Sequence, residues 1–368
     1  MLLFVTFFIV VIIQIFYFYY LFGKFSYSGY KEIQKENTLP VSVIICARNE
    51  ETNLKNFLPY IAEQNHPDFE IILVNDASTD HSFQVMQDFK KEYLKNSNIS
   101  KIQIITLTES KGKKNALEKG IRIASNKFLL LTDADCKPIS NKWVSKMSLS
   151  FNNGKTIILG YGAYQKIKKS FLNKLIRFET LMTAIQYFSY ANLGIPYMGV
   201  GRNIAYAKNE FYSVKGFDSH KHIKSGDDDL LINQIATKNN SSICTDQDAF
   251  TISIPKTNFK VWFNQKRRHI TTATNYKKNH QFLLGLFYVS QFLFWFLAIG
   301  LILKGNTIQY VLLLIFFRFL FWYITIYKSA KMLNETDLIF LAPVLEIGII
   351  CTQMCIFIVN IVSPQKKW

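Results

Sequence analysis

Residues 128–136, FLLLTDADC, form a short apolar run that ends in two aspartates one residue apart. A run of this length between polar residues predicts a buried strand, typical of a parallel sheet covered on both faces. Ligands of open α/β sheets bind beyond the carboxyl ends of the strands, which places Asp133 and Asp135 where a substrate should lie. Side chains alternate along a strand, so we expect both carboxylates to point the same way and to suit a hard divalent cation. The alternative is a strand end with two solvated acids.

The chain around this run alternates between strand-like and helix-like segments. The expected strands are 41–47, 70–74 and 102–107, and the expected helices are 50–64, 82–94 and 112–125. Short connections between such segments predict βαβ units and a mainly parallel sheet. An apolar helix expected at 171–193 could be a core helix or could lie at a membrane interface.

Four apolar segments lie at the two ends of the chain, at 2–21, 282–303, 308–328 and 337–361. Each is long enough to cross a bilayer. Lys24 follows the first segment and predicts that this side is cytoplasmic, whereas Lys366 and Lys367 run against that tendency. Either these two lysines are an exception to the positive-inside tendency, or one of the apolar segments is re-entrant. Arg318 and Glu346 lie within apolar segments, where charge is costly, so we expect an ion pair between them.

These patterns divide the chain into an anchor (1–23), a linker (24–39), an α/β domain with interface helices (40–281) and a C-terminal membrane region of about three helices (282–368). The formal charge of +17 suits nucleic acid, anionic lipid or phosphorylated substrates. No nucleic-acid-binding motif occurs, so lipid head groups and nucleotide phosphates are the expected partners. The five cysteines form no CxxC pair and are expected to be reduced.

Three further polar clusters follow or precede expected helices. Asp76 lies in NDASTD (75–80) and could bind a ligand or cap a helix. Lys113 lies in a glycine-lysine turn, which suits an anion but could be a solvated basic turn. The run GDDD (226–229) holds three adjacent aspartates, whose repulsion can raise the pKa of one to a value useful in a base. A solvated loop that caps a helix is the alternative for this run.

Four motifs, taken in order, resemble those of the membrane-bound family 2 glycosyltransferases. They are VSVIICARNE (41–50), NDASTD (75–80), DAD (133–135) and GDDD (226–229), the last followed by QKRRH (265–269). The resemblance covers residues 40–272 and implies a GT-A fold, a Rossmann-like α/β domain flanked by transmembrane helices. It implies a nucleotide-sugar donor such as a UDP-sugar, and Mg²⁺ or Mn²⁺ as cofactor.

The resemblance assigns expected roles on the donor side. Asp135 would be the metal ligand, and Asp133 would reach the ribose or the metal. Asp76 would contact the nucleoside. The remaining candidates for nucleotide contact are Arg48, Glu50 and Lys113. Glu50 could instead be only a first-turn acid that matches the helix dipole.

On the acceptor side, the resemblance maps the catalytic base onto Asp228 and the preceding acidic position onto Asp227. One positioned carboxylate can take the proton of an attacking hydroxyl. Gln265 and Arg268 match the family's QxxRW motif, but His269 replaces its tryptophan, which puts chain extension in doubt. Arg268 suits bidentate phosphate contact, and Arg202 is a further acceptor or diphosphate candidate.

The sequence therefore predicts an inverting, metal-dependent glycosyltransferase at the cytoplasmic face of a membrane, most simply a bacterial inner membrane. Its acceptor would be lipid-linked or membrane-proximal. Inversion is expected because one base is present without a second carboxylate placed as a nucleophile. Two alternatives stay open: a processive polysaccharide synthase of the same fold, and a non-catalytic membrane scaffold that keeps the fold.

Overall fold

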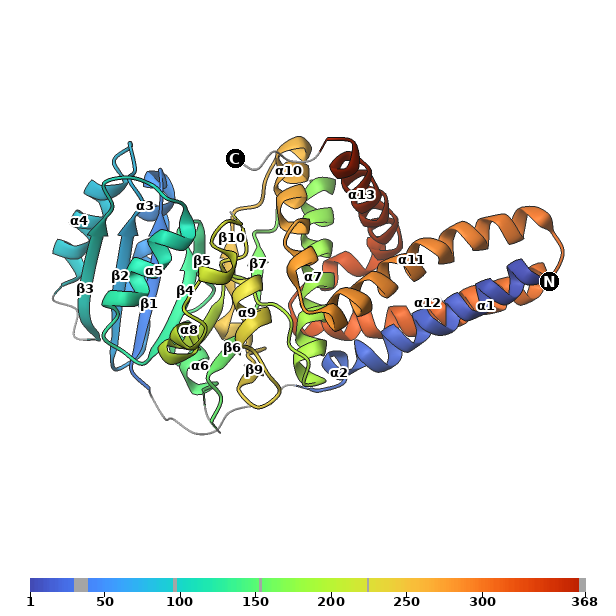
Figure 1. Cartoon of the computed structure of the whole chain (residues 1–368), viewed down its shortest axis with the longest axis horizontal. Coiled ribbons are helices and arrows are strands. Elements are labelled where there is room, and N and C mark those ends of the chain that lie inside the picture. Colours follow the sequence, from blue (N-terminus) through green and yellow to red (C-terminus); the bar gives the residue numbers. More distant parts are fainter. Residues whose placement is uncertain (30–38, 95–97, 152–153, 224, 364–368) are drawn as a thin grey trace. The chain divides into compact units, whose positions relative to one another are not determined.

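The structure is a computed structural model that describes residues 1–29, 39–94, 98–151, 154–223 and 225–363 (Figure 1). The chain forms two compact units, which are treated separately below. The α/β unit comprises Tyr30–Lys168 and Gly194–Lys256, and the helical unit comprises Met1–Gly29, Lys169–Leu193 and Thr257–Trp368. Most of the expected linker, together with Lys366 and Lys367, lies outside the described residues.

The α/β unit is built on a seven-stranded sheet in the order β3-β2-β1-β4-β8-β6-β9. The strands are β3 (Ile99–Thr106), β2 (Phe69–Asn75), β1 (Val41–Ala47), β4 (Phe128–Asp133), β8 (Ile204–Ala207), β6 (Ile157–Leu159) and β9 (Ser241–Ile243). The first four are parallel, whereas β8 pairs antiparallel with β4 and β6. A second sheet joins β5 (Cys136–Pro138), β10 (Thr251–Ser253) and β7 (Gly162–Tyr164). The predicted fold class is confirmed.

Helices cover both faces of this sheet, which explains why its central strands are mostly apolar and buried along nearly their whole length. One face shares a core with α3 (Glu51–Ala62), α4 (Ser82–Tyr93) and α6 (Trp143–Leu149). The other face receives α5 (Lys113–Ile123), whose Gly120 lies so close that an added Cβ would meet Ile44 at 2.9 Å. Shorter helices, α8 (Lys208–Ser213) and α9 (Asp229–Ile235), follow β8 and the GDDD run.

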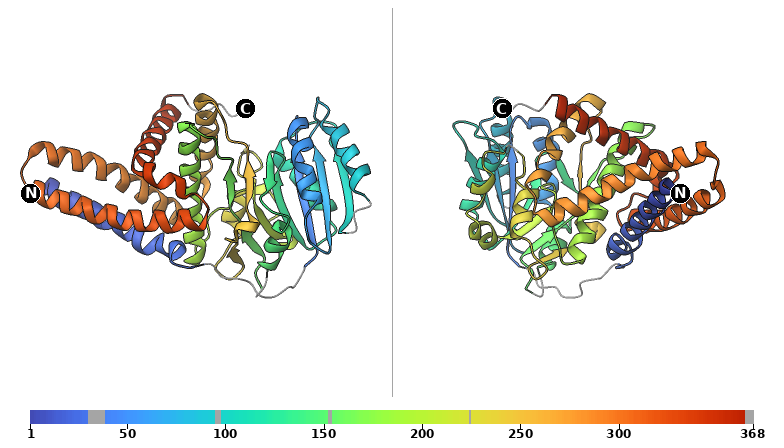
Figure 2. Two further views of the ribbon diagram at one scale, coloured as in Figure 1. Left: turned by 180° about the vertical axis from the view of Figure 1, so that it is seen from behind. Right: turned by 45° about the vertical axis from the view of Figure 1, so that its right-hand side comes forward.

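Among its described residues, the helical unit holds four helices long and apolar enough to cross a membrane. The first runs through α1 (Leu2–Ile15), a π-helical segment η1 (Phe16–Leu21) and α2 (Gly23–Ser26). The others are α11 (Lys278–Lys304), α12 (Ile308–Met332), and η5 (Thr336–Leu341) with α13 (Ala342–Val362). Figure 2 shows α1, α11 and α12 side by side, and Phe7, Phe294 and Val311 share their core.

Polar residues connect these helices in the middle of the apolar unit. Arg318 donates to both carboxylate oxygens of Glu346, at 3.0 and 2.5 Å, so the expected ion pair is confirmed. Gln291 donates to Glu346 at 2.9 Å, and Arg318 also donates to Gln14 at 3.3 Å. We call these four residues the arginine network. Both charges are almost fully buried, so they depend on their partners in the network, and the Arg318 guanidinium also lies over the rings of Phe294 at 4.7 Å and Phe319 at 4.9 Å.

Two more helices, α7 (Phe171–Asn192) and α10 (Phe259–Ile270), belong to the helical unit. Most residues of α7 are buried, so this helix packs as a core element of its unit. Its buried Arg177 pairs with Glu335 and, at 2.8 Å, with Asp337 in the segment that leads into α13. Lys266 of α10 pairs with Glu179 of α7 at 2.5 Å.

Candidate active site

The candidate site lies at the carboxyl ends of β1, β2 and β4, which meet at one edge because these strands are parallel. The loops after β1 and β2 are braced against each other. Asn49 and Ala77 both have positive φ, 57° and 51°, and the Asn49 side chain accepts from the backbone N–H of Thr79 at 2.8 Å. Non-glycine residues adopt this conformation at a cost, which the surrounding bonds offset.

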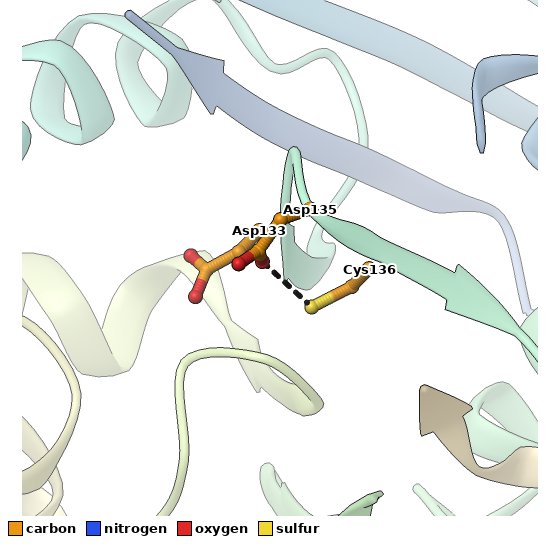
Figure 3. Close-up of side chains that lie close together, drawn as sticks. All are labelled: Asp133, Asp135 and Cys136. Atoms are coloured by element: carbon orange, nitrogen blue, oxygen red, sulfur yellow. Dashed lines mark hydrogen bonds between the residues drawn. The ribbon is translucent and has the colours of Figure 1, made fainter. Parts of the chain in front are cut away.

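Asp133, Asp135 and Cys136 gather their side chains within 4.8 Å of one another (Figure 3). The prediction that the two aspartates converge is confirmed, but the reason given for it is wrong. Strand β4 ends at Asp133, and Asp135 lies in the turn before β5. The reversal of the chain, rather than strand alternation, therefore brings the carboxylates together.

The pair Asp133 and Asp135 fits a divalent cation. Burial, and then the charge of Asp133, raise the pKa of Asp135, so a neighbouring cation would be stabilising there. Within the described part of the chain Asp133 has an ion-pair partner, whereas none is found for Asp135. Carboxylate oxygens are the ligands that Mg²⁺ prefers. The thiol of Cys136 is hydrogen-bonded to Ser253 Oγ at 2.8 Å, and burial raises its pKa well above the usual range, which makes it a poor ligand.

Lys113, at the start of α5, is placed between two of the acids. Its Nζ lies 2.7 Å from Asp133 Oδ1 and 2.8 Å from Asp227 Oδ2. Burial disfavours the charged ammonium, but the charges of Asp133, Asp227 and Asp228 outweigh this and raise the lysine pKa. Burial would likewise raise the pKa of Asp227, but Lys113 outweighs burial and lowers it. The Lys113 side chain is 41% exposed, so the alternative of a solvated basic turn stays open beside its contacts with the two carboxylates.

The pKa of Asp228 is shifted in the opposite direction to that of Asp227. Burial, followed by the charges of Asp227 and Asp229, raises its pKa to about 7. Its Oδ2 accepts from the backbone N–H of Gly201 at 2.6 Å, and its Oδ1 accepts from Asp229 N at 2.7 Å. The second bond is the helix cap that we gave as an alternative, so Asp228 caps α9 and has a perturbed pKa as well. We call Asp133, Asp135, Asp227 and Asp228 the acidic cluster.

An open space of about 370 Å³ adjoins the acidic cluster. Lys113, Gly201 and the buried Tyr206 also line it. This volume includes open solvent, so it describes a gap that opens outward and is bordered by Asp133, Asp227 and Asp228 of the cluster.

Asp76 lies at the end of β2 and is 5% exposed. Its Oδ2 accepts from Ser110 Oγ at 2.8 Å, and Ser110 in turn accepts from Arg48 at 3.0 Å. Its Oδ1 is buried without a hydrogen-bond partner among the described residues. Asp76 does not cap α4, whose N-cap is His81, so the capping alternative is wrong. An unpartnered buried carboxylate oxygen is costly unless a ligand donates to it.

Two further candidates have defined partners of their own. Glu50 precedes α3 and accepts from Asn53 at 2.6 Å, while burial raises its pKa. Arg202 stacks over the Tyr164 ring at 4.1 Å and donates to Ser253 Oγ at 3.1 Å. The guanidinium thereby joins β7 to β10 beside the DAD turn.

The other acceptor-side candidates, Gln265, Arg268 and His269, lie on α10 in the helical unit, so they stay predictions. Sequence reasoning missed Ser110, which links Asp76 to Arg48. It placed Gly201 in a candidate acceptor-side loop with Arg202 but did not foresee that the Gly201 amide binds Asp228. It also missed Lys114, whose Nζ donates to the carbonyls of His220 and Ile223 before the GDDD run. A serine, a glycine and a second lysine carry no signal until tertiary contacts are known.

Residues 42–211 match the family model described as Glycosyl transferase family 2. A poly-β-1,6-N-acetyl-D-glucosamine synthase of Staphylococcus epidermidis is 28% identical over 122 residues, which are 33% of this chain and 28% of that protein. An uncharacterized glycosyltransferase of Haemophilus influenzae is 31% identical over 134 residues, 36% of this chain and 38% of that protein. The matched stretches thus span well under two thirds of these relatives.

Among solved structures, the mannosyltransferase PcManGT from Pyrobaculum calidifontis, in complex with GDP-Man and Mn²⁺, superposes with a TM-score of 0.53. The match covers 93% of this chain and 99% of that chain at 15% identity. At this identity the likeness shows the shared fold.

Proposed function

Because residues 42–211 are a glycosyl transferase family 2 domain, we propose that this chain transfers a sugar from a nucleotide-sugar donor to a lipid-linked or membrane-proximal acceptor. The transfer would take place in one displacement with inversion at the anomeric carbon. The observation that carries the proposal is the acidic cluster, where Lys113 pairs with Asp133 and Asp227 while burial and neighbouring charge raise the pKa of Asp228 to about 7.

Asp228 is the proposed general base. The acceptor hydroxyl oxygen forms a bond to the anomeric carbon while its proton passes to the Asp228 carboxylate. The bond from that carbon to the diphosphate oxygen breaks, and the nucleoside diphosphate leaves with the electron pair. A base with a pKa near the working pH accepts a proton efficiently and can release it afterwards. Its bond from Gly201 keeps the carboxylate directed to the open space at the cluster.

Asp135 and Asp133 are the residues proposed to hold a divalent cation, Mg²⁺ or Mn²⁺. The cation would supply charge neutralisation for the diphosphate leaving group. Lys113 would face the same developing charge from between Asp133 and Asp227. The neighbour of the same fold carries Mn²⁺ and GDP-Man, which is in keeping with this assignment.

Asp76 is the proposed nucleoside contact. Its buried, unpartnered Oδ1 can accept from a base N–H or a ribose hydroxyl. Ser110 and Arg48 fix the other carboxylate oxygen, so the acid is held in one orientation. Uracil offers such an N–H, and for this reason we propose a UDP-sugar as the donor.

The acceptor is proposed to be membrane-bound because four helices of the chain are long and apolar enough to cross a membrane. Lys24, which follows the first apolar span, favours a catalytic unit on the cytoplasmic face of a bacterial inner membrane. Arg268, Gln265, His269 and Arg202 remain the proposed contacts to acceptor or diphosphate, with Arg202 placed beside the DAD turn.

A second candidate is a processive polysaccharide synthase. The similarity to a poly-β-1,6-N-acetyl-D-glucosamine synthase favours it, although the matched stretch is 28% of that protein. The replacement of the motif tryptophan by His269 favours single transfer. Product size separates the two, because a synthase makes a polymer and a single-transfer enzyme adds one sugar.

The decisive experiment incubates the purified full chain in lipid nanodiscs with a panel of nucleotide sugars and Mn²⁺, and measures nucleoside diphosphate release. We expect release from one donor, lost with a chelator and in Asp135→Asn. The matched control is Asp218→Asn, an exposed aspartate that should retain full activity. If no donor is turned over and none binds in a metal-dependent way, the chain is a scaffold that keeps the fold.

A further inference from the structure

Helix α7 carries a row of polar side chains although most of the helix is buried among apolar neighbours. Glu179, Thr183 and Gln186 follow one another at helical spacing, so they lie along one face. Thr183 Oγ1 donates to the carbonyl of Glu179 at 2.9 Å, and Gln186 is 5% exposed. Polar side chains in such surroundings are costly and commonly mark a functional path.

Helices α11 and α13 direct polar side chains to the same place. Tyr288 and Gln291 of α11, and Glu346 and Gln353 of α13, line an open cleft together with the polar row of α7. The space between its side chains is about 350 Å³ when open solvent is included, and Phe287 forms part of its apolar wall. Figure 1 shows the three helices that form it. Polar groups and apolar walls together are typical of a site for an amphipathic ligand.

The charges at this cleft are balanced. Lys266 pairs with Glu179 at 2.5 Å, and Arg318 pairs with Glu346 in the arginine network. Among the described residues that line the cleft there is no lysine or arginine. A phosphate would therefore meet two carboxylates and no lining cation, which is unfavourable.

The remaining polar groups are amides and hydroxyls. The Tyr288 hydroxyl is hydrogen-bonded to the side chains of Gln186 and Gln353. A glutamine amide has two N–H donors and an acceptor oxygen with two lone pairs, so one bond to Tyr288 leaves most of the capacity of Gln353. Groups that both donate and accept match the hydroxyls of a sugar or of glycerol.

We propose that this cleft binds the neutral, hydroxyl-rich head group of a membrane lipid, such as a glycosyl diacylglycerol. The inference rests on the proposed function in so far as such a lipid would be the acceptor. A free saccharide offers the same hydroxyl chemistry, but α11 and α13 are both candidate membrane spans, so a ligand between them would enter from the lipid. The cleft therefore selects a neutral glycolipid over a lipid phosphate.

The test reconstitutes the full chain in phosphatidylcholine nanodiscs that contain glucosyl diacylglycerol, phosphatidylglycerol or undecaprenyl phosphate, and measures retained lipid by native mass spectrometry. We expect preferential retention of the glucosyl lipid. Gln353→Leu should lower it roughly 3- to 10-fold, the worth of one or two neutral hydrogen bonds. Tyr288→Phe, which removes only a hydroxyl, should lower it similarly. The matched control Gln309→Leu changes an exposed glutamine on α12 and should retain the lipid.

Equal retention of either phosphate lipid, or equal retention by Gln353→Leu, Tyr288→Phe and the control, would overturn the proposal. Displacement of the glucosyl lipid by soluble methyl glucoside at low concentration would overturn the lipid source. Donor turnover is measured on the same wild-type preparation. Turnover without glycolipid retention would contradict only the proposal that the cleft binds a glycolipid. Retention without turnover would support that proposal and contradict the proposed sugar transfer.

Discussion

The acidic cluster and the arginine network both bring charged side chains together, but only the network balances its charge. In the network, Arg318 and Glu346 pair with each other, and each also has a hydrogen bond with a glutamine, Gln14 or Gln291. In the cluster, Lys113 forms ion pairs with Asp133 and Asp227. No ion pair to Asp135 or Asp228 is found in the described ranges. A network with equal positive and negative charge needs no further ion, whereas surplus negative charge requires a proton or a cation. This difference separates a structural feature from a candidate catalytic one.

The largest effect is expected when the proposed general base of the acidic cluster is removed. Asp228→Asn should lower transfer by about 10²- to 10⁴-fold, because the amide cannot accept the acceptor proton. The amide oxygen can still cap α9, so the melting temperature should change little. Steady-state transfer and thermal unfolding are measured side by side. A variant with full activity would remove Asp228 from the proposed role.

The next largest effect is expected on stability, when the ion pair of the arginine network is removed. Arg318→Met should lower stability by about 3–5 kcal/mol, because Glu346 is left buried without its partner. The double variant Arg318→Met with Glu346→Gln should recover part of the loss, since both charges are removed. Thermal unfolding in detergent follows the cycle. Additive losses would mean that the two residues do not act as a pair.

A smaller effect is expected in the pH dependence of kcat/KM, which tests the raised pKa of Asp228 in the acidic cluster. Because Asp228 acts only when deprotonated and its pKa is raised to about 7, kcat/KM should rise with pH up to about that value. Below it, the rate should fall about tenfold per pH unit. The residual activity of Asp228→Asn should lack this acidic limb. A wild-type profile that is flat from pH 5 to 8 contradicts the assignment.

The smallest effect is expected from a substitution that adds one carbon beside the acidic cluster and leaves its charge unchanged. An added Cβ at Gly201 would lie 3.3 Å from Asp228 Oδ2 and 3.4 Å from Lys113 Nζ. Gly201→Ala should therefore cost about 1 kcal/mol of transition-state stabilisation, or roughly a fivefold loss of kcat/KM. Gly285→Ala is the matched control, since nothing lies within 4 Å of its added Cβ. Equal kinetics for both variants would show that the approach of Gly201 is not needed.

Sequence reasoning succeeded where a residue type and its local position carry the signal. It found the strand that ends at Asp133, the four apolar spans and the Arg318–Glu346 pair. It failed where the signal depends on distant contacts. Ser110 is ordinary in sequence, and it reaches Asp76 only because the loops after β2 and β3 meet at the sheet edge.

The sequence by itself determined the alternation of strands and helices, the spans and the acids at strand ends, because hydrophobic periodicity and strand polarity are local properties. Only the tertiary structure decided how the charges are shared. It placed Lys113 between Asp133 and Asp227 and left the pKa of Asp228 raised. Burial and neighbouring charge set a pKa, and both depend on which distant segments pack together.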